Sequence, residues 1–162
     1  MSTNGHALAA RITRELRDTE RLIARAEHLL QQAQRYGDMD ILDGAALNLH
    51  GFYAAAERIF EDIAREVDGA LPEGADWHRS LLLQMAAPVP RIRPAVISEE
   101  TYRCLDEFRG FRHVVRNVYT FNLRPARVEE LVKEIGPCFE SLVRDMEAFA
   151  AFLVAADGEA EP

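Results

Sequence analysis

Residues 108–119 read FRGFRHVVRNVY, and the rest of the chain is organised around this stretch. At about 100° per residue, its spacing predicts a helix with two different faces. The apolar face carries Phe108, Phe111, Val114, Val115 and Val118. The polar face carries Arg109, Arg112, His113, Arg116, Asn117 and Tyr119. We therefore expect the apolar face to pack into a core while the polar face presents guanidinium, imidazole, amide and phenol groups.

The charge of this region is opposite to that of the whole chain. Residues 108–128 contain five arginines and no acidic residue, whereas the chain carries a formal charge of −8, which leaves −13 elsewhere. A local basic face on an acidic protein indicates an anion site, and phosphate is the anion that an arginine fork matches best. The alternative is a solvated arginine face that balances acidic neighbours.

Apolar spacing along the rest of the chain is helical. Long amphipathic helices are predicted over residues 6–36, 40–68, 99–119 and 125–155, with a short one over 76–87. Gly37 and Asp38 separate the first two, Ser98 is a suitable N-cap, and Gly136-Pro137 should bend the last helix. The pattern predicts an all-α fold, an up-and-down bundle of four long helices plus a short helix.

The connector at residues 88–98, PVPRIRPAVIS, has three prolines and is expected to run extended over the bundle. Its Arg91 and Arg93 are interpreted as solvated side chains. His50, Tyr53 and Glu57 stand at helical spacing and are expected to be surface or helix–helix hydrogen-bonding groups. His78, in the short helix, is expected to be structural.

Length and composition predict a single domain over residues 1–156 and a disordered acidic tail over 157–162. Cys104 and Cys138 are expected to be buried, reduced thiols, and no pattern indicates a metal or a cofactor. The chain shows neither a signal core nor an apolar run long enough for a membrane span, so a cytoplasmic location is expected.

GFRHVVRNVY resembles the motif of the HEPN superfamily, and specifically of the HepT-like helical proteins: an Arg, four residues, a His, one residue and a Tyr. Gly110, Phe111, Arg112 and Tyr119 match, whereas Asn117 stands at the histidine position and His113 follows the arginine directly. The runs LHGFYAAAERIFEDIA, DWHRSLL and RPAVISEETYRCLDEFRGFRHVVRNVYTFNL extend the resemblance over roughly residues 40–150.

This resemblance implies a HEPN-like bundle that acts as the ribonuclease toxin of a toxin–antitoxin pair. Such proteins are homodimers that cleave RNA without a metal, with the motif Arg and His of both subunits lining a cleft at the interface. The arginine holds the scissile phosphate and the histidine moves the proton of the attacking 2′-hydroxyl. The implied partner is an MntA-like minimal nucleotidyltransferase, which silences the toxin by adding AMP to the motif tyrosine, here Tyr119.

Carried onto this chain, the resemblance makes Arg112, His113 and Asn117 the catalytic candidates and Arg109 and Arg116 candidates for RNA phosphate binding. Asn117 cannot act as a base because an amide does not titrate, but it can orient a hydroxyl. His113 lies one helical turn from position 117 and can titrate near neutral pH. Two alternatives stay open: an RNase centred on Arg112 and His113, or a degenerate module that binds RNA, nucleotide or protein. Arg112 itself has a structural alternative, an ion pair with an acid of the first or second helix.

Overall fold

The computed structural model describes residues 4–117 and 123–160, and these residues are helical almost throughout. The long helices are α1 (Gly5–Tyr36), α2 (Leu42–Ile63), α4 (Glu99–Asn117) and α5 (Pro125–Ala160), and α3 (Trp77–Ala86) is short. A 3-10 turn, Met39–Ile41, precedes α2, and a π-helical turn, Ala64–Asp68, follows it. The predicted all-α bundle is confirmed.

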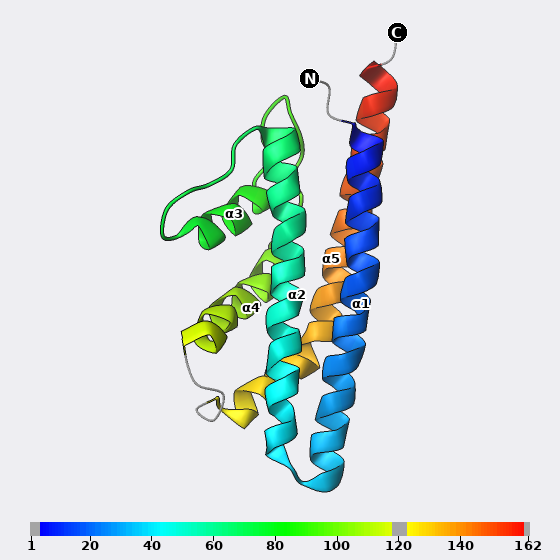
Figure 1. The fold of residues 1–162 in the computed structure, drawn as a ribbon. Coiled ribbons are helices and arrows are strands. Elements are labelled where there is room, and N and C mark those ends of the chain that lie inside the picture. The colour runs from blue at the N-terminus through cyan, green and yellow to red at the C-terminus, as the bar shows by residue number, and fades with distance from the viewer. Residues whose placement is uncertain (1–3, 118–122, 161–162) are drawn as a thin grey trace.

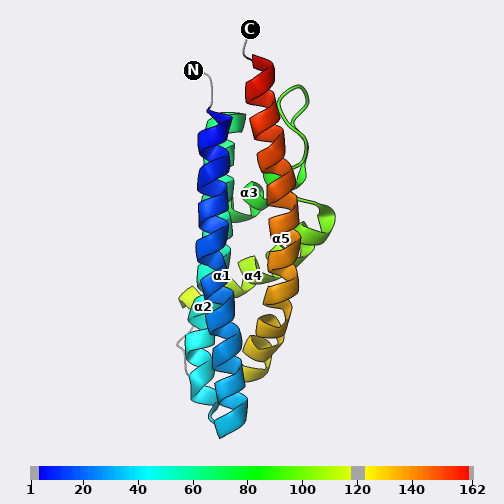
Figure 2. The same ribbon diagram turned by 90° about the vertical axis from the view of Figure 1, so that its right-hand side faces the viewer.

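Figures 1 and 2 show that α1, α2 and α5 run side by side along the molecule, whereas α4 crosses beside them at an angle. The chain alternates direction from α1 to α2, α4 and α5, which is the expected up-and-down order (Figure 1). The short α3 lies on the same side of α2 as α4 (Figure 1). Three elements that are distant in sequence, α2, α3 and α4, therefore meet on one side of the bundle.

The helix ends follow the local sequence. Asn4 caps α1 because its Oδ1 accepts a hydrogen bond from the Ala7 N–H at 3.0 Å. Gly37 ends α1 with φ at +63°, a backbone conformation that glycine adopts without steric cost. Asp38 then caps the 3-10 turn by accepting from the Asp40 N–H at 3.1 Å. The predicted break between the first two helices is confirmed.

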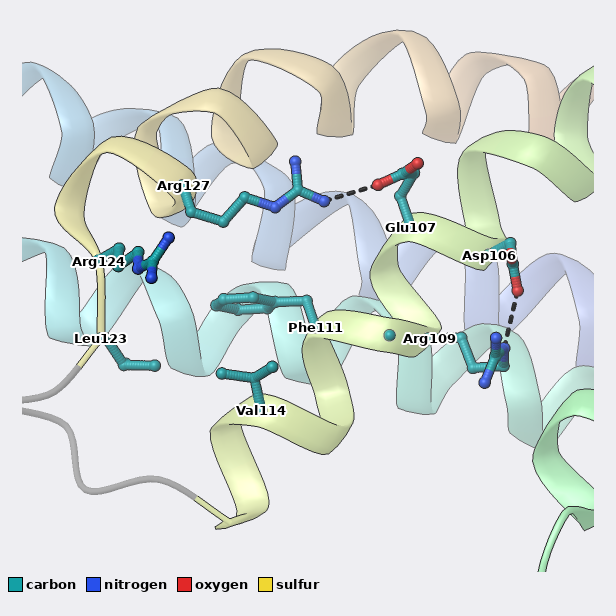
Figure 3. A pocket seen from close by; sticks show the side chains of 9 residues that line it. Asp106, Glu107, Arg109, Phe111, Val114, Leu123, Arg124 and Arg127 are labelled. Atoms are coloured by element: carbon teal, nitrogen blue, oxygen red, sulfur yellow. Dashed lines mark hydrogen bonds and ion pairs between the residues drawn. The ribbon is translucent and has the colours of Figure 1, made fainter.

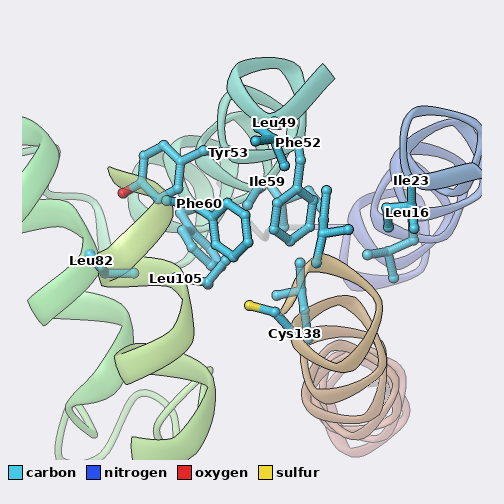
Figure 4. Packing of buried hydrophobic residues seen from close by; sticks show 14 of the residues in the cluster. Leu16, Ile23, Leu49, Phe52, Tyr53, Ile59, Phe60, Leu82, Leu105 and Cys138 are labelled. Carbon is cyan, nitrogen blue, oxygen red and sulfur yellow. The ribbon is translucent and has the colours of Figure 1, made fainter. Parts of the chain in front are cut away.

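Aromatic side chains of α2 form the centre of the core, which Figure 4 shows in close-up. Phe52, Tyr53 and Phe60 are fully or almost fully buried, and Phe52 meets Phe108 of α4 edge to face with ring centroids 5.1 Å apart. The apolar face predicted for α4 is confirmed at Phe108 and Phe111, which are 1% and 6% exposed. It is wrong at Val114, which is 41% exposed, whereas the adjacent Val115 is partly buried against the core. Val118 lies outside the described residues.

A disulfide joins Cys104 of α4 to Cys138 of α5, so the expectation of two reduced thiols was wrong. Each cysteine lies on the face of its helix that packs against the other helix, which brings the two Cα atoms to 5.7 Å. Helical periodicity predicted both cysteines as inward-facing positions. It could not predict that two inward-facing positions of different helices stand opposite each other.

Reducing this disulfide should lower the free energy of unfolding by roughly 3–4 kcal/mol, because it closes a loop with a sequence separation of 34. Urea unfolding followed by circular dichroism, with and without dithiothreitol, measures the effect. The Cys104→Ser/Cys138→Ser variant is the control, and dithiothreitol should leave its transition unchanged. Identical transitions of the wild type in both buffers would contradict the prediction.

The connector between α3 and α4 is a tight turn and is not extended. Val89 and Arg93 form an isolated antiparallel bridge, and Arg91 between them has φ at +69°. Arg91 is exposed as expected, but the interpretation of Arg93 as solvated was wrong. The Arg93 side chain is fully buried and pairs with Asp68, with Nε 2.5 Å from Oδ1 and Nη2 2.8 Å from Oδ2. Proline content predicted the absence of helix but not the turn that this ion pair holds.

The C-terminal helix continues beyond its expected end. α5 extends to Ala160, so residues 157–160 are helical and do not form the disordered tail that was expected there. Asp157 accepts hydrogen bonds from the His6 backbone N–H and side chain at 3.1 Å, which ties the end of α5 to the start of α1. Pro137 lies inside α5, whose first turns run at an angle to the rest (Figures 1 and 2), in agreement with the predicted bend. The division into one domain stays a prediction.

No helix in residues 4–117 and 123–160 is both long enough and apolar enough to cross a membrane. Within the same residues, no group of three or more His, Cys, Asp or Glu side chains is arranged to hold a metal ion.

Candidate functional site

Arg112 points from α4 toward α2 and α3, and its side chain is only 16% exposed. Its Nη1 lies 3.1 Å from Nε2 and 3.2 Å from Nδ1 of His78 on α3. Its Nη2 lies 4.0 Å from Oε1 of Glu57 on α2. The structural alternative, an ion pair with an acid of the second helix, is therefore present in the structure, although 4.0 Å is longer than a hydrogen bond.

Glu57 and His78 form the tightest contact of this cluster. Oε2 of Glu57 lies 2.7 Å from Nδ1 of His78, with the two side chains 6% and 21% exposed. The His78 ring also stacks on its neighbour Trp77, with ring centroids 3.6 Å apart. A buried carboxylate needs a partner of this kind, because isolated burial of its charge is costly. We call Glu57, His78 and Arg112 the α2–α3–α4 cluster.

A pocket of about 490 Å³ opens at this cluster, and we call it the basic pocket. It is lined by Ala75, Asp76, His78, Arg79, Arg109, Arg112 and His113. Its lining is predominantly basic, with three arginines and two histidines to one aspartate, although Arg109 pairs with Asp106 and Arg112 faces Glu57 at 4.0 Å. The structure thus brings the predicted residues Arg109, Arg112 and His113 together with two residues of the α3 helix, His78 and Arg79.

A larger hollow, about 670 Å³, lies beside α4 and the start of α5 (Figure 3). Its centre is apolar, with Phe111, Val114 and Leu123, as Figure 3 shows. Two of its arginines are neutralised by carboxylates: Arg127 Nη2 lies 2.6 Å from Glu107, and Arg109 Nε lies 2.8 Å from Asp106. Arg109 lines both hollows, but the basic pocket also contains Arg112, whose contact with a carboxylate is a long 4.0 Å, and it has a polar lining. It is the better candidate for a phosphate, despite its smaller volume.

Tyr53 lies under the cluster and stays protonated. Burial raises the pKa of its phenol, the Glu57 carboxylate raises it further, and the guanidinium groups of Arg109 and Arg112 partly oppose the shift. A phenol whose pKa is above its ordinary value cannot serve as a base near neutral pH.

The other predicted site residues divide into three groups. His113 is exposed and lines the basic pocket, and Arg109 lines it while pairing with Asp106. Arg116 and Asn117 lie in the last turn of α4, where the structure describes the backbone but not these side chains. Tyr119 lies outside the described residues. Its role stays a prediction.

Sequence reasoning missed Glu57 and His78 as site residues. Both lie in runs that carry the family resemblance, LHGFYAAAERIFEDIA and DWHRSLL, and this was the available signal. Glu57 also occupies a buried position of α2, where an unpaired acid would be unfavourable. A glutamate on an otherwise buried helix face can thus be recognised as a residue that needs a polar or basic partner, although the sequence does not identify that partner.

Comparison with known families decides the identity of the chain. The model of the HepT-like protein family matches residues 44–153, which is more than half of the chain. This chain belongs to the HepT-like family. The match includes every member of the α2–α3–α4 cluster, so the cluster lies within the family's own fold. No curated protein and no solved structure matches the HepT-like chain significantly.

Proposed function

We propose that this HepT-like protein is a metal-independent endoribonuclease, the toxin of a toxin–antitoxin pair. The observation that supports the proposal best is the position of Arg112, whose guanidinium lies in the basic pocket at 3.1 Å from an imidazole nitrogen. A guanidinium offers paired donors to phosphate oxygens and stays charged at every useful pH. An imidazole beside it is a side chain that can accept and return a proton during the reaction.

In this proposal Arg112 holds the scissile phosphate and stabilises the charge that develops on it during transfer. A histidine of the pocket, either His113 or His78, accepts the proton of the attacking 2′-hydroxyl. Asn117 orients a ribose hydroxyl or a phosphate oxygen, and Arg109 and Arg116 extend the phosphate track along α4. The protein works in the cytoplasm as a symmetric homodimer with the two α4 helices facing each other. The 41% exposure of Val114 supports this arrangement, because an apolar side chain near the C-terminal end of α4 is available for contact with a second subunit.

The proposal predicts cleavage of single-stranded RNA that EDTA does not inhibit, because proton transfer and phosphate binding are assigned to side chains alone. Purified protein is incubated with end-labelled RNA in EDTA and in Mg²⁺, and the products are resolved on a gel. The expected products carry a 2′,3′-cyclic phosphate and a 5′-hydroxyl. Cleavage that EDTA abolishes and Mg²⁺ restores would contradict the assignment.

A second candidate function is a catalytically degenerate HEPN module that binds RNA, nucleotide or a protein partner. Asn117 at the motif's histidine position is the observation that favours it. The substitution Asn117→His separates the two functions. Activity that arises only in this variant would identify the natural chain as the degenerate module, whereas activity in the wild type that Arg112→Ala removes supports the enzyme.

The resemblance also implies that Tyr119 accepts AMP from an MntA-like nucleotidyltransferase. Tyr119 follows Arg112 by seven residues in sequence, so AMP on its phenol would add a phosphate that competes with RNA for the arginines. We expect co-expression with such a transferase to add one or more AMP units to the intact mass. The Tyr119→Phe variant is the control and should stay unmodified. Unmodified wild-type protein beside an active transferase would end this part of the proposal.

A further inference from the structure

We propose that Glu57 and His78 are the proton-transfer pair of the basic pocket, with His78 as the base that activates the RNA 2′-hydroxyl and Glu57 as its positioning residue. The inference rests on the proposed ribonuclease function and deepens it. It places the base on α3, outside the motif of α4, where Asn117 occupies the histidine position. The evidence comes from the tautomer, the burial and the neighbours of the His78 imidazole.

The contact with Glu57 determines the tautomer of His78. A carboxylate can only accept a hydrogen bond, so Nδ1, at 2.7 Å from Glu57 Oε2, carries the proton that it donates. A neutral imidazole protonated at Nδ1 keeps its lone pair on Nε2. The Arg112 guanidinium does not select between the tautomers, because its Nη1 lies 3.1 Å from Nε2 and 3.2 Å from Nδ1. The contact with Glu57 therefore assigns the proton to Nδ1 and leaves Nε2 as the proton acceptor.

Burial holds this arrangement in place. The Glu57 side chain is 6% exposed and comes from the rigid α2 helix, while the His78 side chain is 21% exposed and borders the basic pocket. The carboxylate is therefore shielded from water, and the imidazole still reaches the space where a ligand would lie. Trp77 stacks on the ring and restricts its rotation. In enzymes that use a histidine as a general base, a third group commonly orients the imidazole. Here the buried Glu57 carboxylate would orient His78 in this way.

Arg112 lies beside His78, which is the position that a phosphate-binding side chain must have if His78 is the base. The 2′-oxygen of a ribose and the adjacent phosphate are only a few ångströms apart, so the base and the phosphate-binding side chain have to be neighbours. Nε of Arg112 is buried and has no hydrogen-bond partner, and its contact with Glu57 is a long 4.0 Å. The donors of this guanidinium are thus incompletely satisfied by the protein. A phosphate entering the basic pocket would supply oxygen acceptors to the part of the guanidinium that is exposed there.

The two candidates on α4 fit less well. Asn117 has no titratable group. His113 is exposed, so any contact of its ring competes with water. His78 borders the same pocket and is held by Glu57, whose carboxylate is buried and shielded from water.

The reaction that follows is a transesterification. Nε2 of His78 accepts the proton of the 2′-hydroxyl as the 2′-oxygen forms a bond to the adjacent phosphorus. The bond from phosphorus to the 5′-oxygen breaks, and this oxygen leaves with a proton taken from water. The resulting hydroxide takes up the proton of the imidazolium, which restores the neutral ring. The products are a 2′,3′-cyclic phosphate and a 5′-hydroxyl, and no redox change occurs.

The test uses the full-length protein and an end-labelled single-stranded RNA. His78→Ala should lower kcat by about 10²–10⁴-fold while RNA affinity changes little, because the base contributes to the reaction and not to phosphate binding. Added imidazole should restore part of the rate by entering the space that the side chain has left. His28→Ala, which removes an exposed histidine of α1, is the matched control and should cleave like the wild type. Circular dichroism verifies that each variant is folded.

Glu57→Gln tests the positioning role. It should lower kcat in the wild-type background but cause no further loss in His78→Ala, because Glu57 acts through His78. A merely structural role would lower the rate in both backgrounds. Glu61→Gln, one turn further along α2, is the control, since Glu61 pairs only loosely with Arg65, at 3.5 Å.

The outcomes separate this inference from the proposed function. If the wild type cleaves RNA and Arg112→Ala does not, while His78→Ala retains the wild-type kcat, the ribonuclease stands and the assignment of His78 is overturned. If folded His78→Ala is slower than the wild type but imidazole restores nothing and Glu57→Gln lowers the rate in both backgrounds alike, His78 is structural and the assignment is also overturned. If the wild type cleaves no RNA, the proposed function fails and this inference fails with it.

Discussion

Replacing Arg112 by alanine should lower RNA cleavage by about 10²–10³-fold, the usual loss when one preorganised donor to a developing negative charge is removed. The guanidinium lies in the basic pocket, beside His78, so its removal takes away both the phosphate contact and the charge next to the base. RNA binding should weaken as well. Its salt dependence should become shallower, because one phosphate contact fewer releases fewer counterions.

Arg103→Ala is the matched control for this experiment. Arg103 lies on the same α4 helix and carries the same charge, but its side chain is 77% exposed and pairs with Glu99 at 3.1 Å. Cleavage and salt dependence should match those of the wild type in this variant. Wild-type cleavage by a folded Arg112→Ala variant, or an unchanged salt slope, would mean that Arg112 does not contact RNA phosphate.

The largest loss of stability is expected from Asp68→Ala, about 3–5 kcal/mol, because it leaves a buried guanidinium without its counter-charge. The Arg93 side chain is fully buried, and Asp68 is 4% exposed and meets it with both carboxylate oxygens. Arg93 also donates to the backbone oxygens of Gln84, Ala87 and Pro94 at 2.9–3.1 Å. The pair thus joins the π-helical turn that follows α2 to the end of α3 and to the turn that leads into α4.

Urea unfolding of Asp68→Ala and wild type measures this loss. Asp62→Ala is the control, because Asp62 is also an aspartate near the end of α2 but is 38% exposed and pairs with Arg11 and Arg65 on the surface. A surface pair of this kind should contribute less than about 1 kcal/mol. Equal losses in the two variants would show that burial does not distinguish the two aspartates. Because the pair fixes α3, a destabilised Asp68→Ala should also cleave RNA poorly at temperatures where it is still folded.

The helices were predictable because each is marked by apolar residues at helical spacing and by local capping groups. Gly37 and Asp38 separate α1 from α2 through their own backbone and side-chain chemistry, which needs no knowledge of the fold. Gly44 and Gly51 lie where α2 packs closely against α1. A Cβ at either position would come within 3.2 Å of Leu29 or Leu22 of α1. Such features depend on near neighbours in sequence or on one helix face.

The contacts between distant segments were not predictable in the same way. Arg93 and Asp68 are 25 residues apart, and nothing local distinguishes Arg93 from the solvated Arg91 two residues before it. Cys104 and Cys138 meet only because α4 and α5 pack in one particular register. The same limitation applies to the candidate site. The sequence marked Arg112 and His113 because they share a helix, whereas Glu57 and His78 enter the site from two other helices.

The central claim is that the pocket between α3 and α4 holds an RNA phosphate at Arg112. It is tested most directly by a crystal structure of the protein with a short RNA that carries a 2′-deoxy nucleotide at the cleavage position and therefore cannot react. The account predicts a phosphate within hydrogen-bond distance of the Arg112 guanidinium, with the 2′-carbon of the preceding sugar facing Nε2 of His78. An RNA bound elsewhere on the protein, with no phosphate at Arg112, would contradict it.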